Sequence, residues 1–112
     1  NNLREEAYEK ALEVLDKCVR KQGFYASGLK GGYEATWSRD SMITAIGASL
    51  CGTRYKSAFL HSLNTLGKWQ TPKGQIPNCV GSYNLERRSD KTYNSIDSSL
   101  WYIIGHYVYA EA

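Results

Sequence analysis

Residues 36–51 read TWSRDSMITAIGASLC, and no charged residue follows Asp40 in this stretch. The pattern predicts a helix over 39–51, with Ser38 as its N-terminal cap and Gly52 at its end. The side chains after Asp40 leave this helix without a polar face. Because a helix that is apolar all round is buried, we expect this one to have neighbours on every side.

Three more helices are predicted around it. A second charge-poor helix begins at residue 96 or 97 and continues to the end of the chain, with no charge before Glu111. Helices over 3–21 and 54–70 instead combine an apolar face with a charged face, as outward-facing helices do. The order outer, inner, outer, inner is the order that a ring of helical hairpins requires.

We therefore predict an all-α fold, with one domain over residues 1–112. No strand pattern competes with the helices, although the segment from Gly23 to Thr36 has room for a short hairpin. Four helices do not close a ring of hairpins, and the chain ends inside an apolar helical pattern. We expect it to be the amino-terminal part of a longer domain, truncated at its C-terminal end.

The connections between the helices bring two carboxylates together. Only Gly52 and Thr53 join the second and third helices, so these two helices must be antiparallel neighbours. The link over 71–95 is long and contains prolines and glycines, which is typical of a functional or disordered loop without regular structure. If this loop stays at one end of the ring, Asp40 and Asp97 open two inner helices at that end and face a shared pocket.

Composition excludes several function classes. The net charge is only +3, and acidic residues interrupt the one dense basic patch, so we expect no nucleic-acid partner. No apolar run is long enough to span a membrane, and no secretory signal opens the chain. The three cysteines lie far apart without a CxxC pair, which favours reduced thiols in a cytoplasmic, reducing compartment. We expect no metal site and no cofactor.

Each of the two acids has a plain structural explanation, because an acid in the first turn of a helix satisfies free backbone N–H groups. Asp97, however, is flanked by Ile96, Leu100 and Trp101, and partial desolvation is expected to raise its pKa toward the range of a general acid. Sugar cleavage with inversion uses an acid and a base roughly 6.5–9.5 Å apart. The two interpretations stay open for each acid taken alone.

Other residues near this end of the ring would suit a sugar site. Arg39 can grip hydroxyl groups, and aromatic rings offer an apolar face with a polar edge. The alternative for the tryptophans is core packing, which we favour for Trp69 at the end of its apolar stripe. The candidates are Tyr33, Trp37, Arg39, Trp69 and Trp101.

Three short motifs resemble a known superfamily. TWSRDS (36–41) resembles the Trp-x-Arg-Asp motif of glucoamylases and of the glucosidase domain of glycogen-debranching enzymes. GQIPN (74–78) resembles the Gly-x-Ile-Pro-Asn stretch that follows in debranching enzymes. NSIDSSLW (94–101) resembles their Asn-x-x-Asp-x-x-x-Trp segment and a segment of neutral invertases. The three motifs stand in the family order and cover about residues 33–108.

The resemblance implies an (α/α)6 toroid, as in six-hairpin glycosidases, with its pocket at the N-terminal ends of the inner helices. It implies Asp97 as the catalytic general acid and Arg39 and Asp40 as ligands of the terminal sugar, with Trp37 packing nearby. Glucoamylases place a Glu in the acid role within a different local sequence, so this chain departs from them there. The general base of the superfamily comes from a later part of the barrel. The candidate substrate-binding set is Tyr33, Trp37, Arg39, Asp40, Asn78 and Trp101.

These residues favour an inverting glycoside hydrolase that releases glucose from α-glucans, at α-1,4 chain ends or α-1,6 branch stubs. Its partners would be an oligo- or polysaccharide substrate and the remainder of the barrel. Three alternatives stay open: an invertase- or trehalase-like glycosidase, a carbohydrate-binding fragment without turnover, and a plain helical interaction domain. The fragment alone is expected to be inactive and poorly folded, because the base and the covering helices would be missing.

Overall fold

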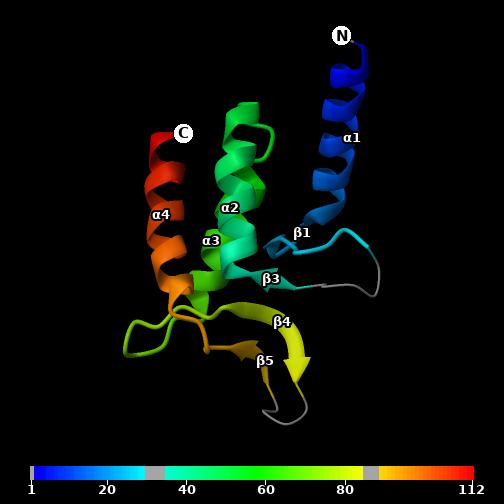
Figure 1. Cartoon of the computed structure of the whole chain (residues 1–112). Coiled ribbons are helices and arrows are strands. Elements are labelled where there is room, and N and C mark those ends of the chain that lie inside the picture. Colours follow the sequence, from blue (N-terminus) through cyan, green and yellow to red (C-terminus); the bar gives the residue numbers. More distant parts are fainter. Residues whose placement is uncertain (1, 30–34, 85–88) are drawn as a thin grey trace.

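The computed structural model describes residues 2–29, 35–84 and 89–112, and it contains the four predicted helices (Figure 1). All four begin and end within a few residues of the predicted bounds. A 3-10 turn, η1 (Ser49–Cys51), extends the second helix. The helices are α1 (Asn2–Cys18), α2 (Ser38–Ala48), α3 (Lys56–Lys68) and α4 (Asp97–Glu111).

The fold is mostly helical, as predicted, and it also contains two small antiparallel sheets that the all-α prediction did not include. The strands β1 (Val19–Arg20) and β2 (Gly23–Phe24) form an antiparallel hairpin after α1. The strands β3 (Thr36–Trp37), β4 (Cys79–Asn84) and β5 (Ser89–Thr92) form a second antiparallel sheet in the order β3-β4-β5. The segment from Gly23 to Thr36, where the sequence allowed a short hairpin, lies partly outside the described residues. The strands at its two ends, β2 and β3, belong to different sheets.

The prediction of a loop without regular structure over 71–95 was therefore wrong. β4 and β5 lie within this link, and β4 pairs with β3 directly before α2, with Trp37 opposite Cys79. Figure 1 shows this sheet lying below the N-terminal ends of α2 and α4. The described helices do not close a ring, so the (α/α)6 toroid stays a prediction.

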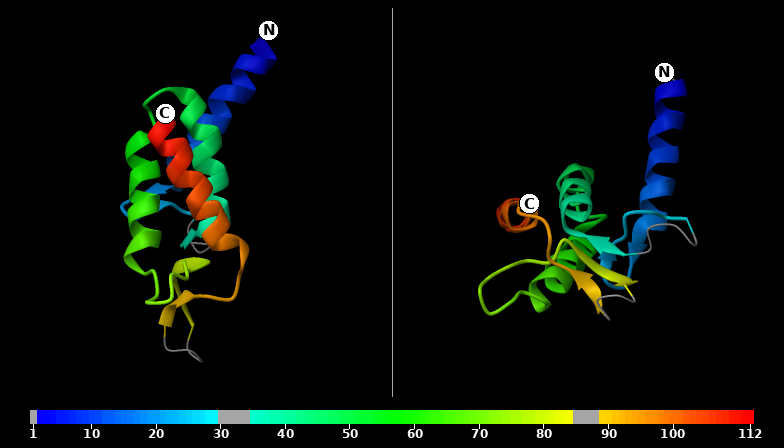
Figure 2. Two further views of the ribbon diagram at one scale, coloured as in Figure 1. Left: turned by 90° about the vertical axis from the view of Figure 1, so that its left-hand side faces the viewer. Right: turned by 60° about the horizontal axis from the view of Figure 1, so that its bottom comes forward.

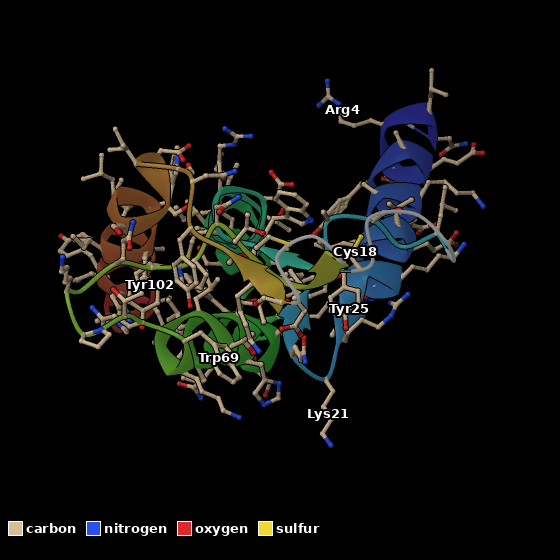
Figure 3. The ribbon with its side chains drawn as sticks, turned by 90° about the horizontal axis from the view of Figure 1, so that it is seen from below. Arg4, Cys18, Lys21, Tyr25, Trp69 and Tyr102 are labelled. Carbon is tan, nitrogen blue, oxygen red and sulfur yellow. The ribbon has the colours of Figure 1, made fainter. Side chains whose placement is uncertain are left out.

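The core lies between α2, α3 and α4, with Phe24 of β2 inserted from the side. The predicted apolar stripe of α3 is confirmed, because Phe59, Leu63 and Leu66 are almost fully buried. Trp69 is an exception, since 37% of it is exposed at the end of α3 (Figure 3). Its ring lies under the Lys91 ammonium, 3.6 Å from Nζ to the ring centroid, rather than in the core.

Among the described residues, α2 and α4 each keep an exposed apolar face, so their burial on every side stays a prediction for the complete ring. Ile43 of α2 and Ile103 and Tyr107 of α4 are exposed, and Leu50 after α2 is 88% exposed. α2 and α4 pack on each other and on α3 (Figure 2). These contacts cover only one side of α2 and one side of α4.

α2 and α4 are parallel, and both begin at the end of the molecule where the β3-β4-β5 sheet lies (Figures 1 and 2). The buried Ser38 hydroxyl at the start of α2 donates a hydrogen bond to the Ser98 carbonyl of α4 over 3.0 Å. Further along, Gly105 of α4 lies so close to α2 that a Cβ added there would fall on Sδ of the buried Met42. The topological inference that placed the starts of these two helices together is confirmed.

α1 stands apart from the other helices, and none of its residues is buried (Figure 2). It is tied to the start of α3 by Asp16, which accepts a 2.7 Å hydrogen bond from the Tyr55 hydroxyl and a 2.8 Å bond from Arg54. The Tyr55 bond, aided by Arg54, lowers the pKa of Asp16, although desolvation opposes the shift. Burial and the same contact raise the pKa of Tyr55 to about 12. The outward-facing character predicted for α1 is confirmed.

We expect Gly105→Ala to lower the melting temperature of the protein, measured by thermal unfolding. The added methyl group must displace Met42 between α2 and α4, and overpacking of a core costs roughly 1–3 kcal/mol. Gly47→Ala in α2 is the matched control, because a Cβ there meets nothing within 4 Å and alanine is the better helix former by about 1 kcal/mol. Equal effects of the two substitutions would contradict the close approach at Gly105.

Candidate active site

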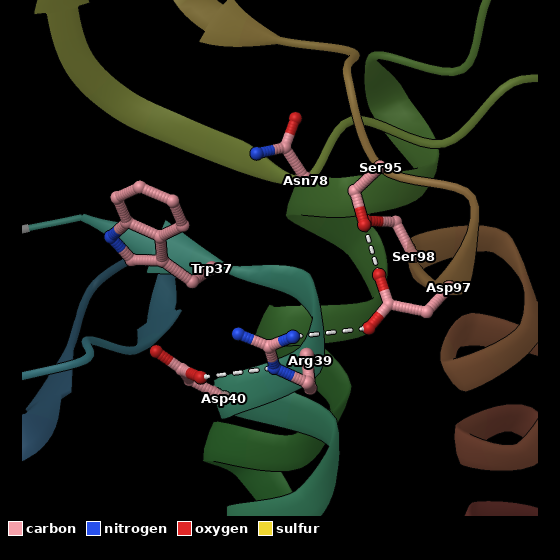
Figure 4. A pocket seen from close by; sticks show the side chains of 7 residues that line it. All are labelled: Trp37, Arg39, Asp40, Asn78, Ser95, Asp97 and Ser98. Atoms are coloured by element: carbon pink, nitrogen blue, oxygen red, sulfur yellow. Dashed lines mark hydrogen bonds and ion pairs between the residues drawn. The ribbon is translucent and has the colours of Figure 1, made fainter.

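A pocket of about 210 Å³ lies at the N-terminal ends of α2 and α4, beside the β3-β4-β5 sheet (Figure 4). Its wall is formed by the starts of α2 and α4, the end of β3, the residue before β4 and the segment before α4. The lining residues are Trp37, Arg39, Asp40, Asn78, Ser95, Asp97 and Ser98.

Asn78 connects the parts of the chain that form the pocket. Its carbonyl accepts a 2.9 Å hydrogen bond from the Ser38 N–H at the start of α2, and its own N–H donates to the Thr92 carbonyl over 2.7 Å. Its side-chain oxygen accepts a 3.1 Å bond from the Asn94 N–H, in the segment that leads into α4. One residue thus fixes the spacing between β4, β5 and the starts of both helices.

Arg39 lies between the two carboxylates of the pocket. Its Nη1 is 3.3 Å from Oδ2 of Asp97, and its Nε is 3.9 Å from Oδ1 of Asp40 (Figure 4). Arg39 and Asp40 are exposed, so both groups are open to a ligand that enters from solvent. The guanidinium is a planar donor that matches paired oxygen atoms, and the carboxylates accept hydrogen bonds.

Asp97 is held in its ionised form. The Ser95 hydroxyl donates to its Oδ1 and lowers the pKa of Asp97 below the usual value, and the nearby Arg39 lowers it further. Partial burial acts in the opposite direction but is outweighed. The expectation that desolvation would raise this pKa was therefore wrong for the ligand-free pocket, because a hydroxyl and a guanidinium favour the carboxylate more than burial disfavours it.

The structure brings together five of the predicted site residues, which come from three separate stretches of the sequence. Trp101 does not line the pocket, because its half-buried side chain packs against the hydrophobic core. The core-packing alternative therefore describes Trp101 in this structure. Tyr33 lies outside the described residues. The five at the pocket are Trp37, Arg39, Asp40, Asn78 and Asp97.

Two lining residues, Ser95 and Ser98, were not predicted as site residues. Both stand in the Asn-Ser-Ile-Asp-Ser-Ser stretch, where serine is also a common residue at the start of a helix. A serine two residues before a helix-opening acid is a signal for a local hydrogen bond to that acid. Ser98 gave no such signal, since its role is a backbone contact with Ser38 from a distant part of the chain.

The described residues contain neither a metal-binding cluster nor a membrane-spanning helix. No group of three or more His, Cys, Asp or Glu side chains lies in an arrangement that could hold a metal ion. No described helix has the length and apolar character needed to cross a membrane.

We expect Ser95→Ala to raise the pKa of Asp97, measured by NMR titration of its carboxyl carbon. The substitution removes the donor that contributes most to the lowered value. A carboxyl with a lowered pKa in the folded protein adds stability above its unfolded pKa and loses it as the pH falls through the folded value. As the pH falls from the pKa of Asp97 in the unfolded protein to its lower pKa in the folded protein, Ser95→Ala should therefore lose less stability than the wild type. Ser57→Ala, at an exposed position of α3, is the control, and an unshifted Asp97 titration in Ser95→Ala would contradict the contact.

Comparison with known proteins identifies the family. The family model described as amylo-alpha-1,6-glucosidase matches residues 12–112, which include every residue that lines the pocket. No curated protein and no solved structure gave a significant match. The matched family is one of glycosidases of the glycogen-debranching type. The chain belongs to the amylo-α-1,6-glucosidase family.

Proposed function

We propose that this chain supplies the sugar-binding groups and the general acid of an inverting glycoside hydrolase. The enzyme would release glucose from α-glucans, at α-1,6 branch stubs or α-1,4 chain ends. The observation that carries the proposal is the placement of Arg39 between Asp40 and Asp97 in one small pocket, in a chain of the amylo-α-1,6-glucosidase family. The proposed partners are the glucan and the remainder of the catalytic barrel.

The pocket has the size and chemistry for one terminal sugar. Its volume of about 210 Å³ is below the roughly 300–1,000 Å³ of sites for drug-sized ligands, which favours a single small ring. Arg39 offers donors and Asp40 offers acceptors to neighbouring hydroxyl groups, and Trp37 provides an apolar wall. Asn78 offers the donors of its side-chain amide, since its side-chain oxygen is engaged by Asn94.

Asp97 would act as the general acid once the sugar is bound. In the free pocket it is ionised, so it must gain a proton before the reaction. A bound sugar competes for Arg39 and excludes water from the carboxylate, and both changes raise its pKa. The protonated carboxyl then donates its proton to the bridging oxygen as the bond from that oxygen to C1 of the terminal sugar breaks.

The second half of the reaction needs a base that removes a proton from water as the water attacks C1 from the opposite face. We expect this base from a later part of the barrel, as in the resembling enzymes, so activity is measured on the full-length protein. We also propose a cytoplasmic location, because the three cysteines lie far apart in the sequence without a CxxC pair.

Asp97→Asn tests the proposed acid. A general acid contributes roughly 10²–10⁴-fold to the rate, and an amide has no acidic proton to donate. We therefore expect kcat for glucose release from a branch-stub oligosaccharide to fall by about this factor, with sugar binding, measured by calorimetry, nearly unchanged. Asp90→Asn is the matched control, because Asp90 is a carboxylate of β5 that does not line the pocket. Wild-type turnover in Asp97→Asn would rule out the assignment.

A further inference from the structure

The segment between β5 and α4 connects the sheet to the helix that opens with Asp97. Residues 93–96 belong to neither element, so regular secondary structure does not fix their backbone. Ser95 lies in this segment, and its hydroxyl donates a hydrogen bond to Oδ1 of Asp97 (Figure 4). The direction of that bond therefore depends on the contacts that hold residues 93–96 in place.

Hydrogen bonds on two sides anchor the segment to the rest of the fold. The Tyr93 hydroxyl donates to the carbonyl of Trp69, directly after α3, over 2.6 Å. The Asn94 N–H donates to the side-chain oxygen of Asn78, directly before β4, over 3.1 Å. A contact of 3.5 Å from the Gln75 amide to the Tyr93 carbonyl is long for a hydrogen bond and adds little. Asn94 thus ties the segment to the sheet, and Tyr93 ties it to the helical core.

The Trp69 carbonyl is a strong acceptor in a well-held position. The last carbonyls of a helix have no partner within it, and they lie at the negative end of the helix dipole. The Trp69 N–H donates to the Leu66 carbonyl over 3.3 Å, and the Trp69 ring lies under the Lys91 ammonium of β5. The end of α3 therefore holds both β5 and the segment that follows it.

Tyr93 does not line the pocket, so its link to Asp97 runs through the chain and through Ser95. Arg39 also contacts Asp97, over 3.3 Å, but it comes from α2 and does not depend on the segment. Loosening residues 93–96 would therefore weaken the contact from Ser95 and leave the one from Arg39. Because Ser95 contributes most to the lowered pKa of Asp97, a change in the position of Ser95 can be measured at Asp97.

We propose that Tyr93 is a positioning residue for Asp97: its bond to the end of α3 holds residues 93–96 so that the Ser95 hydroxyl meets the carboxylate. The importance of this contact for catalysis rests on the proposed function, in which Asp97 is the general acid. The contact itself does not rest on it, because it is present in the ligand-free protein.

Tyr93→Phe in the full-length protein tests the proposal, because it keeps the ring and removes only the hydroxyl. The Ser95 hydroxyl should then meet Asp97 less often, so the pKa of Asp97, measured by NMR titration without ligand, should rise. Maximal kcat for a branch-stub oligosaccharide, compared at each variant's own pH optimum, should fall by up to about tenfold, the effect of one lost hydrogen bond. KM should stay nearly unchanged, since the pocket wall loses no side chain.

Tyr55→Phe is the matched control. It removes a phenol hydrogen bond of almost the same length, 2.7 Å to Asp16, at the opposite end of α3 from Trp69. A hydrogen bond to a charged acceptor is worth at least as much stability as one to a carbonyl. The control should therefore lower the melting temperature as much as Tyr93→Phe or more, while the pKa of Asp97 and maximal kcat stay at their wild-type values.

A second background tests the route through Ser95. In Ser95→Ala the donor to Asp97 is absent, so adding Tyr93→Phe should shift the pKa of Asp97 no further. An unshifted pKa or an unchanged maximal kcat in Tyr93→Phe would overturn the proposal, and so would an equal pKa shift in Tyr55→Phe or in the Ser95→Ala background. Wild-type turnover in Asp97→Asn would instead contradict the proposed function, whatever the titration of Asp97 shows.

Discussion

The parallel contact between α2 and α4 is the constraint on which the site depends. Two features hold the helices together: the buried hydrogen bond from Ser38 to the Ser98 carbonyl, and the close approach at Gly105, where Met42 occupies the space of a side chain. Because both helices start at the same end, their first turns place Arg39 and Asp97 within 3.3 Å across 58 residues of sequence. An antiparallel arrangement would put these two side chains at opposite ends.

The sheet adds a second constraint at the same end. β4 pairs with β3 just before α2 begins, and β5 pairs with β4 shortly before α4 begins, so both helices are anchored to one platform. Asn78 joins the helix starts through backbone and side-chain hydrogen bonds. The ionised state of Asp97 in the pocket follows from this geometry. Ser95 and Arg39 stabilise the Asp97 carboxylate, so in the proposed mechanism a bound sugar has to raise the pKa of Asp97 before this residue can act as an acid.

The sequence could predict the features that repeat along the helices. The apolar stripe of α3, the outward-facing character of α1 and the parallel start of α2 and α4 follow from residue spacing and connection length. The second sheet could not be predicted in the same way. β3 has two residues and pairs with residues more than 40 positions away, and β5 reads SDKT, which has no alternation of apolar and polar side chains. Likewise, the ionised state of Asp97 depends on how the Ser95 hydroxyl is turned, which spacing does not determine.

The structure of the full-length protein with an uncleaved substrate analogue, linked through sulfur in place of the bridging oxygen, tests the central claim most directly. The account predicts the terminal ring in the pocket, with its hydroxyl groups on Arg39 and Asp40. It also predicts a carboxyl oxygen of Asp97 within hydrogen-bond reach of the linking atom, about 2.6–3.2 Å for an oxygen and slightly longer for sulfur. A sugar bound elsewhere, or a linking atom that no oxygen of Asp97 approaches, would contradict the account.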